Sequence, residues 1–218
     1  MNKIFTIEKV EPSYTTIKHG YLYNGYVVNS TPSIANTGWR IPTEADFNEI
    51  QSILVPNASF KIREENLEYW NGTYGHGDLY LFHARGSGMR AINGTFSLLK
   101  EECKYRTSTS GTLGLKNAWL YWEASLVCDS GPSNKEGYSI RLVRDNPTLE
   151  AGSVGSYTGN DGKVYRTTRI GNLEWMSDNL AETKWSNGTS IPIITNNTLW
   201  SNDISGAMCS YNNDGNNV

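Results

Sequence analysis

The sequence predicts an α+β fold with short antiparallel strands, one or two helices and long loops. Aromatic residues make up 11% of the chain, charged residues 19%, and there are 21 Gly. This balance is typical of loop-rich β or α+β proteins and not of helical bundles or disordered chains. One strong helical pattern stands among many strand and turn signals. A chain of 218 residues buries roughly 70% of its unfolded surface, so we expect a real hydrophobic core.

The N-terminal part of the chain reads as strand. In residues 1–18, Ile4 and Thr6 alternate with Phe5 and Ile7, the period of an edge strand followed by a connector. Residues 20–28 are rich in Tyr, Leu and Val and are also expected to be β-structure.

The clearest helix is expected over residues 43–55. Thr43 is a good N-cap, and acidic residues in the first turn favour the helix dipole. Pro56 should end the helix. The apolar positions recur on one face: Phe47, Ile50 and Leu54.

From residue 70 onward, turn signals separate short strands. Asn-Gly pairs occur at 71–72, 93–94 and 187–188. Each is followed by Thr and so matches a glycosylation sequon, but we interpret all three as turns. Residues 137–144 predict a strong strand.

The last third of the chain begins with a predicted hairpin. Residues 163–170 and 173–179 flank Gly171-Asn172, which is the two-residue spacing of a β-hairpin. Residues 146–156 read as a linker of Pro, Gly and Ser. The last seven residues are mostly Asn, Asp and Gly and are expected to be mobile.

Several short motifs resemble one known family. The motifs are Asp161-Gly162-Lys163-Val164-Tyr165, Trp175-Met176 with Asn179-Leu180, Gly188-Thr189 with Ile191-Pro192, Cys209 to Asp214, Gly20 to Val28, Gly38-Trp39-Arg40-Ile41-Pro42-Thr43, and Gly137 to Asp145. As a set they are similar to the Fibrobacter succinogenes major paralogous domain, a family with a C-type-lectin-like fold. Arg106 and Gly25 stand where the family usually has Trp.

The family's opening motifs come second in this chain. The resemblance therefore implies a circularly permuted or segment-swapped domain. Its larger part would be residues 19–145, and residues 157–218 would complete that part in the same chain or in a neighbouring one. Surface loops tolerate such rearrangement.

In the wider fold, the stretch that corresponds to residues 103–136 displays side chains outward. The resemblance thus implies a ligand-binding surface there, with Trp119 and Tyr121 on one strand face and Trp122 directed to the core. Its candidate residues are Tyr105, Arg106, Leu113, Lys116, Trp119, Tyr121, Ser133, Asn134 and Lys135.

Metal, cofactor and catalytic roles are not expected. Asn160-Asp161-Gly162 and the stretch 212–215 resemble fragments of calcium loops, but neither is followed by a distal Glu, and we interpret both as turns. His19, His76 and His83 have no partners at a telling spacing. Cys103, Cys128 and Cys209 form no zinc motif or disulfide framework and are expected to be reduced thiols. Formylglycine-generating enzymes share the fold but need a reactive Cys pair.

The expected function is recognition without catalysis. With 22 acidic and 19 basic residues, the net charge of −3 does not provide the excess positive charge that is typical of nucleic-acid-binding proteins. No signal peptide or membrane span is recognisable. We expect a bacteriophage fibre or decoration protein, made in the cytoplasm and then located in the virion or outside the cell after lysis. Its partners would be a bacterial surface glycan or protein, other virion proteins and further copies of itself, as a trimer or segment-exchanged oligomer. The alternative is a free carbohydrate- or protein-binding module, diversified by a retroelement.

Overall fold

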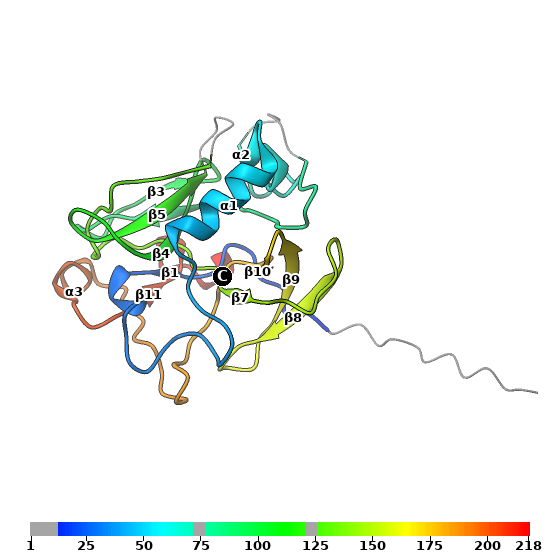
Figure 1. Ribbon diagram of the computed structural model, residues 1–218. Coiled ribbons are helices and arrows are strands. Elements are labelled where there is room, and N and C mark those ends of the chain that lie inside the picture. Colours follow the sequence, from blue (N-terminus) through cyan, green and yellow to red (C-terminus); the bar gives the residue numbers. More distant parts are fainter. Residues whose placement is uncertain (1–12, 72–76, 121–125) are drawn as a thin grey trace, which may run out of the picture.

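The computed structural model describes residues 13–71, 77–120 and 126–218. The fold is mixed α+β, with two larger sheets, one small sheet and short helices (Figure 1). The helices are α1 (Glu44–Leu54), α2 (Ala58–Lys61) and α3 (Asn197–Asn202), with 3-10 turns at Gly25–Val27, Tyr211–Asn213 and Gly215–Asn217. Tyr121, Trp122, His76 and the strand expected before residue 13 lie outside the described residues.

The strands form three sheets. The five-stranded sheet has the order β3-β2-β4-β5-β6, the four-stranded sheet β7-β10-β9-β8, and the small sheet pairs β1 with β11. The strands are β1 (Leu22–Tyr23), β2 (Ser87–Arg90), β3 (Phe96–Leu99), β4 (Cys103–Ser110), β5 (Leu115–Leu120), β6 (Leu126–Cys128), β7 (Val143–Asp145), β8 (Val154–Thr158), β9 (Val164–Ile170), β10 (Leu173–Met176) and β11 (Met208–Cys209).

Helix α1 confirms the helical pattern of the sequence. Thr43 caps it in a capping box with Asp46, and Phe47, Ile50 and Leu54 are its buried residues. The Phe47 ring lies 4.9 Å from that of Trp175 on β10, between centroids. The helix therefore contacts both larger sheets, and in Figure 1 it lies above the four-stranded sheet and beside the five-stranded one.

The predicted hairpin is also confirmed. Strands β9 and β10 pair with Ile170 opposite Leu173, and Gly171 takes a positive φ of 61° in the turn between them. The second strand ends at Met176 and does not continue to residue 179.

Two other predictions were wrong because nonlocal contacts decide the structure of these segments. Residues 20–28 contain only the two-residue strand β1 before a 3-10 turn. Residues 137–144 are not one strand: they form isolated bridges to β1, β2 and β4 before β7 begins at Val143. The predicted linker 146–156 contains no helix or strand up to residue 153, and β8, which pairs with β9, begins within it at Val154.

The C-terminal tail is ordered by packing, contrary to expectation. Gly215–Asn217 forms a 3-10 turn, and Val218 packs against the core around Tyr23, Ile140 and Met176. The Val218 carbonyl also accepts a hydrogen bond from the Lys18 amide at 3.2 Å. Accordingly, the C-terminus lies in the middle of the molecule in Figure 1.

Residues 154–218 pack on residues 19–145 of the same chain. Leu173 on β10 pairs with Asp145 on β7, and Cys209 on β11 pairs with Leu22 on β1. The two sequence segments thus share the four-stranded sheet, the small β1–β11 sheet and the hydrophobic core.

Arg141 joins these two segments inside the core. Its side chain is fully buried, and Nε donates to Asn179 Oδ1 at 2.9 Å. The terminal nitrogens donate to the carbonyls of Phe82, His83 and Met176. The guanidinium lies 4.3 Å from the centroid of the Phe82 ring, a cation–π contact that offsets part of the desolvation cost.

Arg90 makes a second connection of the same kind. Its Nη2 donates to the Thr195 carbonyl and to Asn197 Oδ1, both at 3.0 Å. Its guanidinium lies 4.4 Å from the ring centroid of Trp200 on α3. The segment that ends in α3 is therefore held to β2 through a buried cation.

The Arg141→Lys variant should be destabilised by about 2–4 kcal/mol, because Lys cannot reach three carbonyls and an amide oxygen with one compact ammonium. Urea unfolding measures the loss. Arg169→Lys is the matched control: Arg169 is only half-buried and also donates to two carbonyls, those of Gly171 and Leu149. It should cost less than about 1 kcal/mol. Equal losses in the two variants would contradict the role given to Arg141.

Candidate recognition surface and pocket

Two residues of the predicted ligand surface are buried, so their assignment to it was wrong. Tyr105 on β4 faces the core, with its ring 6.0 Å from those of Phe47 and Phe82. Arg106 lies on the opposite face of β4 but is also fully buried. Its guanidinium lies 4.6 Å from the Tyr138 ring centroid and donates to the Glu136 carbonyl. Neither side chain can meet a ligand without local unfolding.

The predicted residues 133–135 form hydrogen bonds that connect β5, the turn at Gly25 and helix α3. Asn134 Oδ1 accepts from the Leu115 amide at 2.9 Å, and its carbonyl accepts from the Gly25 amide at 2.6 Å. A Cβ at Gly25 would lie 2.5 Å from Asn134 Oδ1, which explains why Trp is absent from position 25. Lys135 Nζ donates to the Ser201 carbonyl at 2.7 Å, and the Ser133 hydroxyl accepts from the Lys135 amide at 3.2 Å.

The structure places the other described candidates apart from one another. Leu113 is 80% exposed in the β4–β5 connection. Lys116 forms an ion pair with Glu44 of α1 at 2.8 Å, on the helix-covered side of the sheet. Trp119 points to the other side, next to Val127 on β6, which is 46% exposed.

Trp119 belongs to a ladder of rings and cations on this second face of the sheet, where its neighbours Arg106, Asn117 and Tyr138 are buried. Lys104 Nζ lies 4.4 Å from the Trp119 ring centroid and 5.3 Å from that of Tyr138. Arg106 lies close to the same Tyr138 ring, whose hydroxyl donates to Glu136 Oε2 at 2.8 Å. These contacts hold the half-buried Trp119 ring on a rigid base. We call Trp119, Lys104 and Val127 the Trp119 surface.

A pocket of about 250 Å³ lies elsewhere, where the N-terminal part of the described chain crosses the 64–69 loop. Sequence reasoning did not find it, because its residues are scattered along the chain. They are Tyr14, Thr15, Thr16, Ile17, Tyr69, Arg85 and Arg166.

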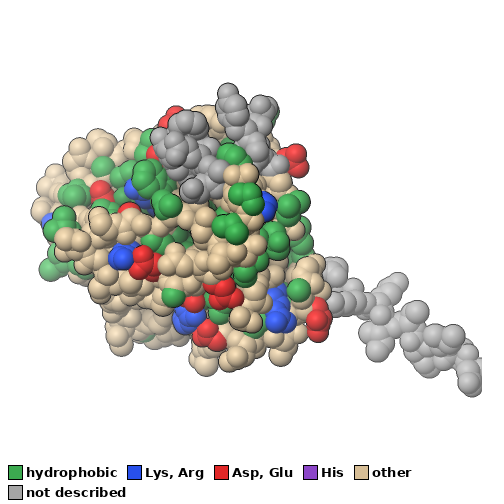
Figure 2. All heavy atoms as spheres, turned by 45° about the horizontal axis from the view of Figure 1, so that its top comes forward, with side chains coloured by type: hydrophobic (Ala, Val, Ile, Leu, Met, Phe, Trp, Pro, Cys, Tyr) green, Lys and Arg blue, Asp and Glu red, His purple; other side chains and the backbone are tan. Residues whose placement is uncertain are grey.

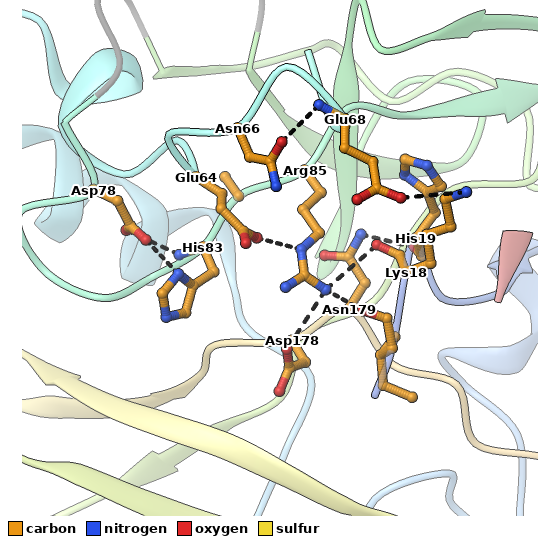
Figure 3. Close-up of polar contacts among 12 residues, drawn as sticks. Lys18, His19, Glu64, Asn66, Glu68, Asp78, His83, Arg85, Asp178 and Asn179 are labelled. Carbon is orange, nitrogen blue, oxygen red and sulfur yellow. Dashed lines mark hydrogen bonds and ion pairs between the residues drawn. The ribbon is translucent and has the colours of Figure 1, made fainter. Parts of the chain in front are cut away.

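Arg85 is the most buried charged group of this pocket, at 3% exposure. Figure 3 shows it between Glu64, Asp178 and the backbone of the 17–18 segment. Nε donates to Glu64, and Nη1 donates to the Ile17 carbonyl and lies 3.6 Å from Asp178 Oδ1. Its guanidinium stacks 4.4 Å from the Tyr69 ring centroid.

Arg166 is the second cation of the pocket and is paired with Asp178. Its backbone amide donates to Asp178 Oδ2 at 3.0 Å, and its Nε and Nη2 bind the same carboxylate. Burial of Asp178 acts to raise its pKa, but the hydrogen bonds and charge of Arg166 outweigh burial, and the pKa lies below its ordinary value. Asp178 therefore stays ionised and fixes both arginines.

Two histidines lie near this cluster (Figure 3). The His19 ring is 1% exposed and contacts Tyr69 edge-on at 5.6 Å, and neither ring nitrogen has a hydrogen-bond partner among the described residues. Burial, reinforced by the charges of Lys18, Arg85 and Lys100, lowers the pKa of His19 to about 4. The sequence showed no partner for His83 at a telling spacing; in the structure its Nδ1 lies 2.5 Å from Asp78 Oδ2.

The residues that the structure describes form no candidate metal site. In residues 13–71, 77–120 and 126–218, no group of three or more His, Cys, Asp or Glu could hold a metal ion. Cys103, Cys128 and Cys209 are free thiols. None of the described helices is long and apolar enough to cross a bilayer.

Comparison with known proteins gives the family. The mixed α+β architecture is compatible with the motifs noted in the sequence. The Fibrobacter succinogenes major domain matches residues 3–144, well over half of the chain, and the chain belongs to this family. No curated protein and no solved structure matches the chain significantly.

The neutral buried His19 predicts an acid-sensitive stability. Its pKa falls from 6.5 to about 4 on folding, so the unfolded chain binds a proton first as the pH falls. Stability is thus lost between about pH 6.5 and 4, on the order of 3 kcal/mol in total. Replacing His19 by Leu should remove this contribution, which urea unfolding across that pH range measures. Parallel stability curves for the two proteins would contradict the assignment.

Proposed function

We propose that this chain is a non-catalytic recognition module with a C-type-lectin-like fold in permuted order. Three observations support the proposal: family membership over residues 3–144, the mixed α+β sheets, and a partly exposed Trp119 beside the exposed Val127 at the edge of the five-stranded sheet. The packing of residues 154–218 onto β1 and β7 is what a permuted domain requires.

The Trp119 surface is the observation on which this function depends most. A half-buried Trp held by a neighbouring cation is already ordered, so a ligand that stacks on it does not have to order the ring. Trp is also among the usual anchors of recognition sites. Trp119 is held in this way by Lys104, above the buried Tyr138 and Arg106. The flat ring and the adjacent ammonium suit the apolar face and the hydroxyls of a sugar.

The proposed ligand is a glycan of a bacterial surface, and the proposed setting is a bacteriophage fibre or decoration protein that assembles with further copies of itself. On the face shown in Figure 2, acidic and basic side chains are interspersed and form no broad field of one sign. Recognition would then depend on local stacking and hydrogen bonds more than on long-range attraction. Mass spectrometry of purified particles tests the setting: the protein should be a stoichiometric component, and its absence from every particle would contradict this part of the proposal.

Replacing Trp119 by Ala should weaken glycan binding about tenfold or more, because a central aromatic anchor typically contributes more than 1–2 kcal/mol. A bacterial glycan array probed with the full chain identifies the ligand, and isothermal titration then measures the loss. Trp39→Ala is the matched control. Trp39 is also half-buried and also lies beside a cation, Arg144, at 5.2 Å. Unchanged affinity in the Trp119 variant, or equal loss in both, would contradict the assignment.

A further inference from the structure

The pocket beside Arg85 presents hydrogen-bond donors that the protein itself does not use. Arg85 donates through Nε and Nη1, while its Nη2 makes no hydrogen bond to any described residue. Arg166 donates through its backbone amide, Nε and Nη2, and its Nη1 is likewise without a bond in the described part of the chain. Both side chains line the same pocket. Two guanidinium groups, each with one terminal nitrogen that bonds no described residue, therefore line one pocket.

Each of these arginines also has an acidic partner. Glu64 accepts from Nε of Arg85, and Asp178 accepts from Nε and Nη2 of Arg166. They neutralise the cations in the free protein and fix the planes of the guanidinium groups. The remaining N–H groups of the two guanidinium groups can each donate a hydrogen bond. A planar carboxylate matches a pair of guanidinium N–H donors best.

The other walls of the pocket suit a sugar ring. Tyr14 and Tyr69 supply aromatic surface, and Thr15 and Thr16 are short polar side chains. Tyr69 is held between the Arg85 guanidinium at 4.4 Å and the His19 ring at 5.6 Å, so its position is fixed. The volume of about 250 Å³ lies below the roughly 300–1,000 Å³ of sites for drug-sized ligands, so the pocket accommodates one ring.

We propose that this pocket binds an acidic sugar, with the carboxylate on the spare nitrogens of Arg85 and Arg166 and the ring beside Tyr69. The pocket is distinct from the Trp119 surface, since it is built from residues 14–17, the 64–69 loop, Arg85 and β9. The inference rests on the proposed function in that it takes the ligand to be a glycan. It adds a second subsite that would select charged over neutral sugars.

The experiment is an NMR titration of the full chain, with sodium glucuronate as the probe and glucose as its neutral counterpart. Glucuronate should shift the backbone amides of Thr16, Tyr69 and Arg166 in a saturable way, and glucose should not. Affinity should fall as the salt concentration rises. Absent or equal shifts with the two sugars would overturn the proposal.

Thr16 offers a charge test at the pocket rim that leaves the core untouched, because its side chain is exposed. Thr16→Glu places a carboxylate beside the ligand's own and should weaken glucuronate binding about tenfold. Thr16→Gln has the same size without the charge and should change affinity less than about twofold. Unfolding midpoints show that both variants fold. Equal affinities of the two variants would also overturn the proposal.

A Trp119→Ala variant separates the two proposals. Glucuronate shifts at Thr16 and Tyr69 should persist in it, which would support the pocket whatever happens to array binding. If neutral glycans bind through Trp119 while glucuronate does not bind, the acidic-sugar pocket is wrong and the recognition function stands. If glucuronate binds at the pocket and no glycan depends on Trp119, the acidic-sugar pocket stands and the recognition role of the Trp119 surface is wrong.

Discussion

The hydrogen bonds of buried Arg141 are the interaction on which the rest of the structure depends. This guanidinium reaches Asn179 and Met176 in the C-terminal segment and the carbonyls of Phe82 and His83 in the N-terminal segment. A charge at 0% exposure is tolerated only when its donors are satisfied. Carbonyl oxygens and the faces of Phe82 and Tyr105 satisfy it here. The cation therefore requires both segments to be present and in register.

The segment that binds Arg141 also positions the Arg85 pocket. Asn179 also donates to the His19 carbonyl at 2.9 Å, next to the pocket formed around Arg85. Asp178, one residue earlier, pairs with Arg166 and lies near Arg85. The same turn of chain that receives Arg141 thus positions the pocket. The Trp119 surface depends instead on Arg106 beneath Tyr138, within the five-stranded sheet.

The sequence was sufficient wherever structure is local. The helix α1 follows from Thr43 and three apolar positions, and the β9–β10 hairpin follows from Gly171-Asn172. Residues 137–142 were misread because positions 137, 138 and 139 pair with three different strands, whereas propensity alone suggested one continuous strand. The tail was misread because its order comes from Val218 packing on a distant core. For the site, Tyr105 and Arg106 were expected outside, but both faces of β4 are covered at these positions. The Arg85 pocket could not be predicted, since no spacing rule links residues 14–17 to Arg166.

The central claim is that residues 154–218 complete the domain of their own chain, and a disulfide tests it most directly. Leu22 on β1 lies opposite the native free thiol of Cys209 on β11, and directly opposed residues have Cβ atoms within roughly 5.5 Å. The Leu22→Cys variant should form this bond on oxidation, and Leu22→Ser serves as the control. The account predicts a disulfide-linked species of one chain, 24.3 kDa, on a nonreducing gel at every protein concentration. Covalent dimers or longer oligomers joined through positions 22 and 209 would contradict it and show that the segment completes a neighbouring chain.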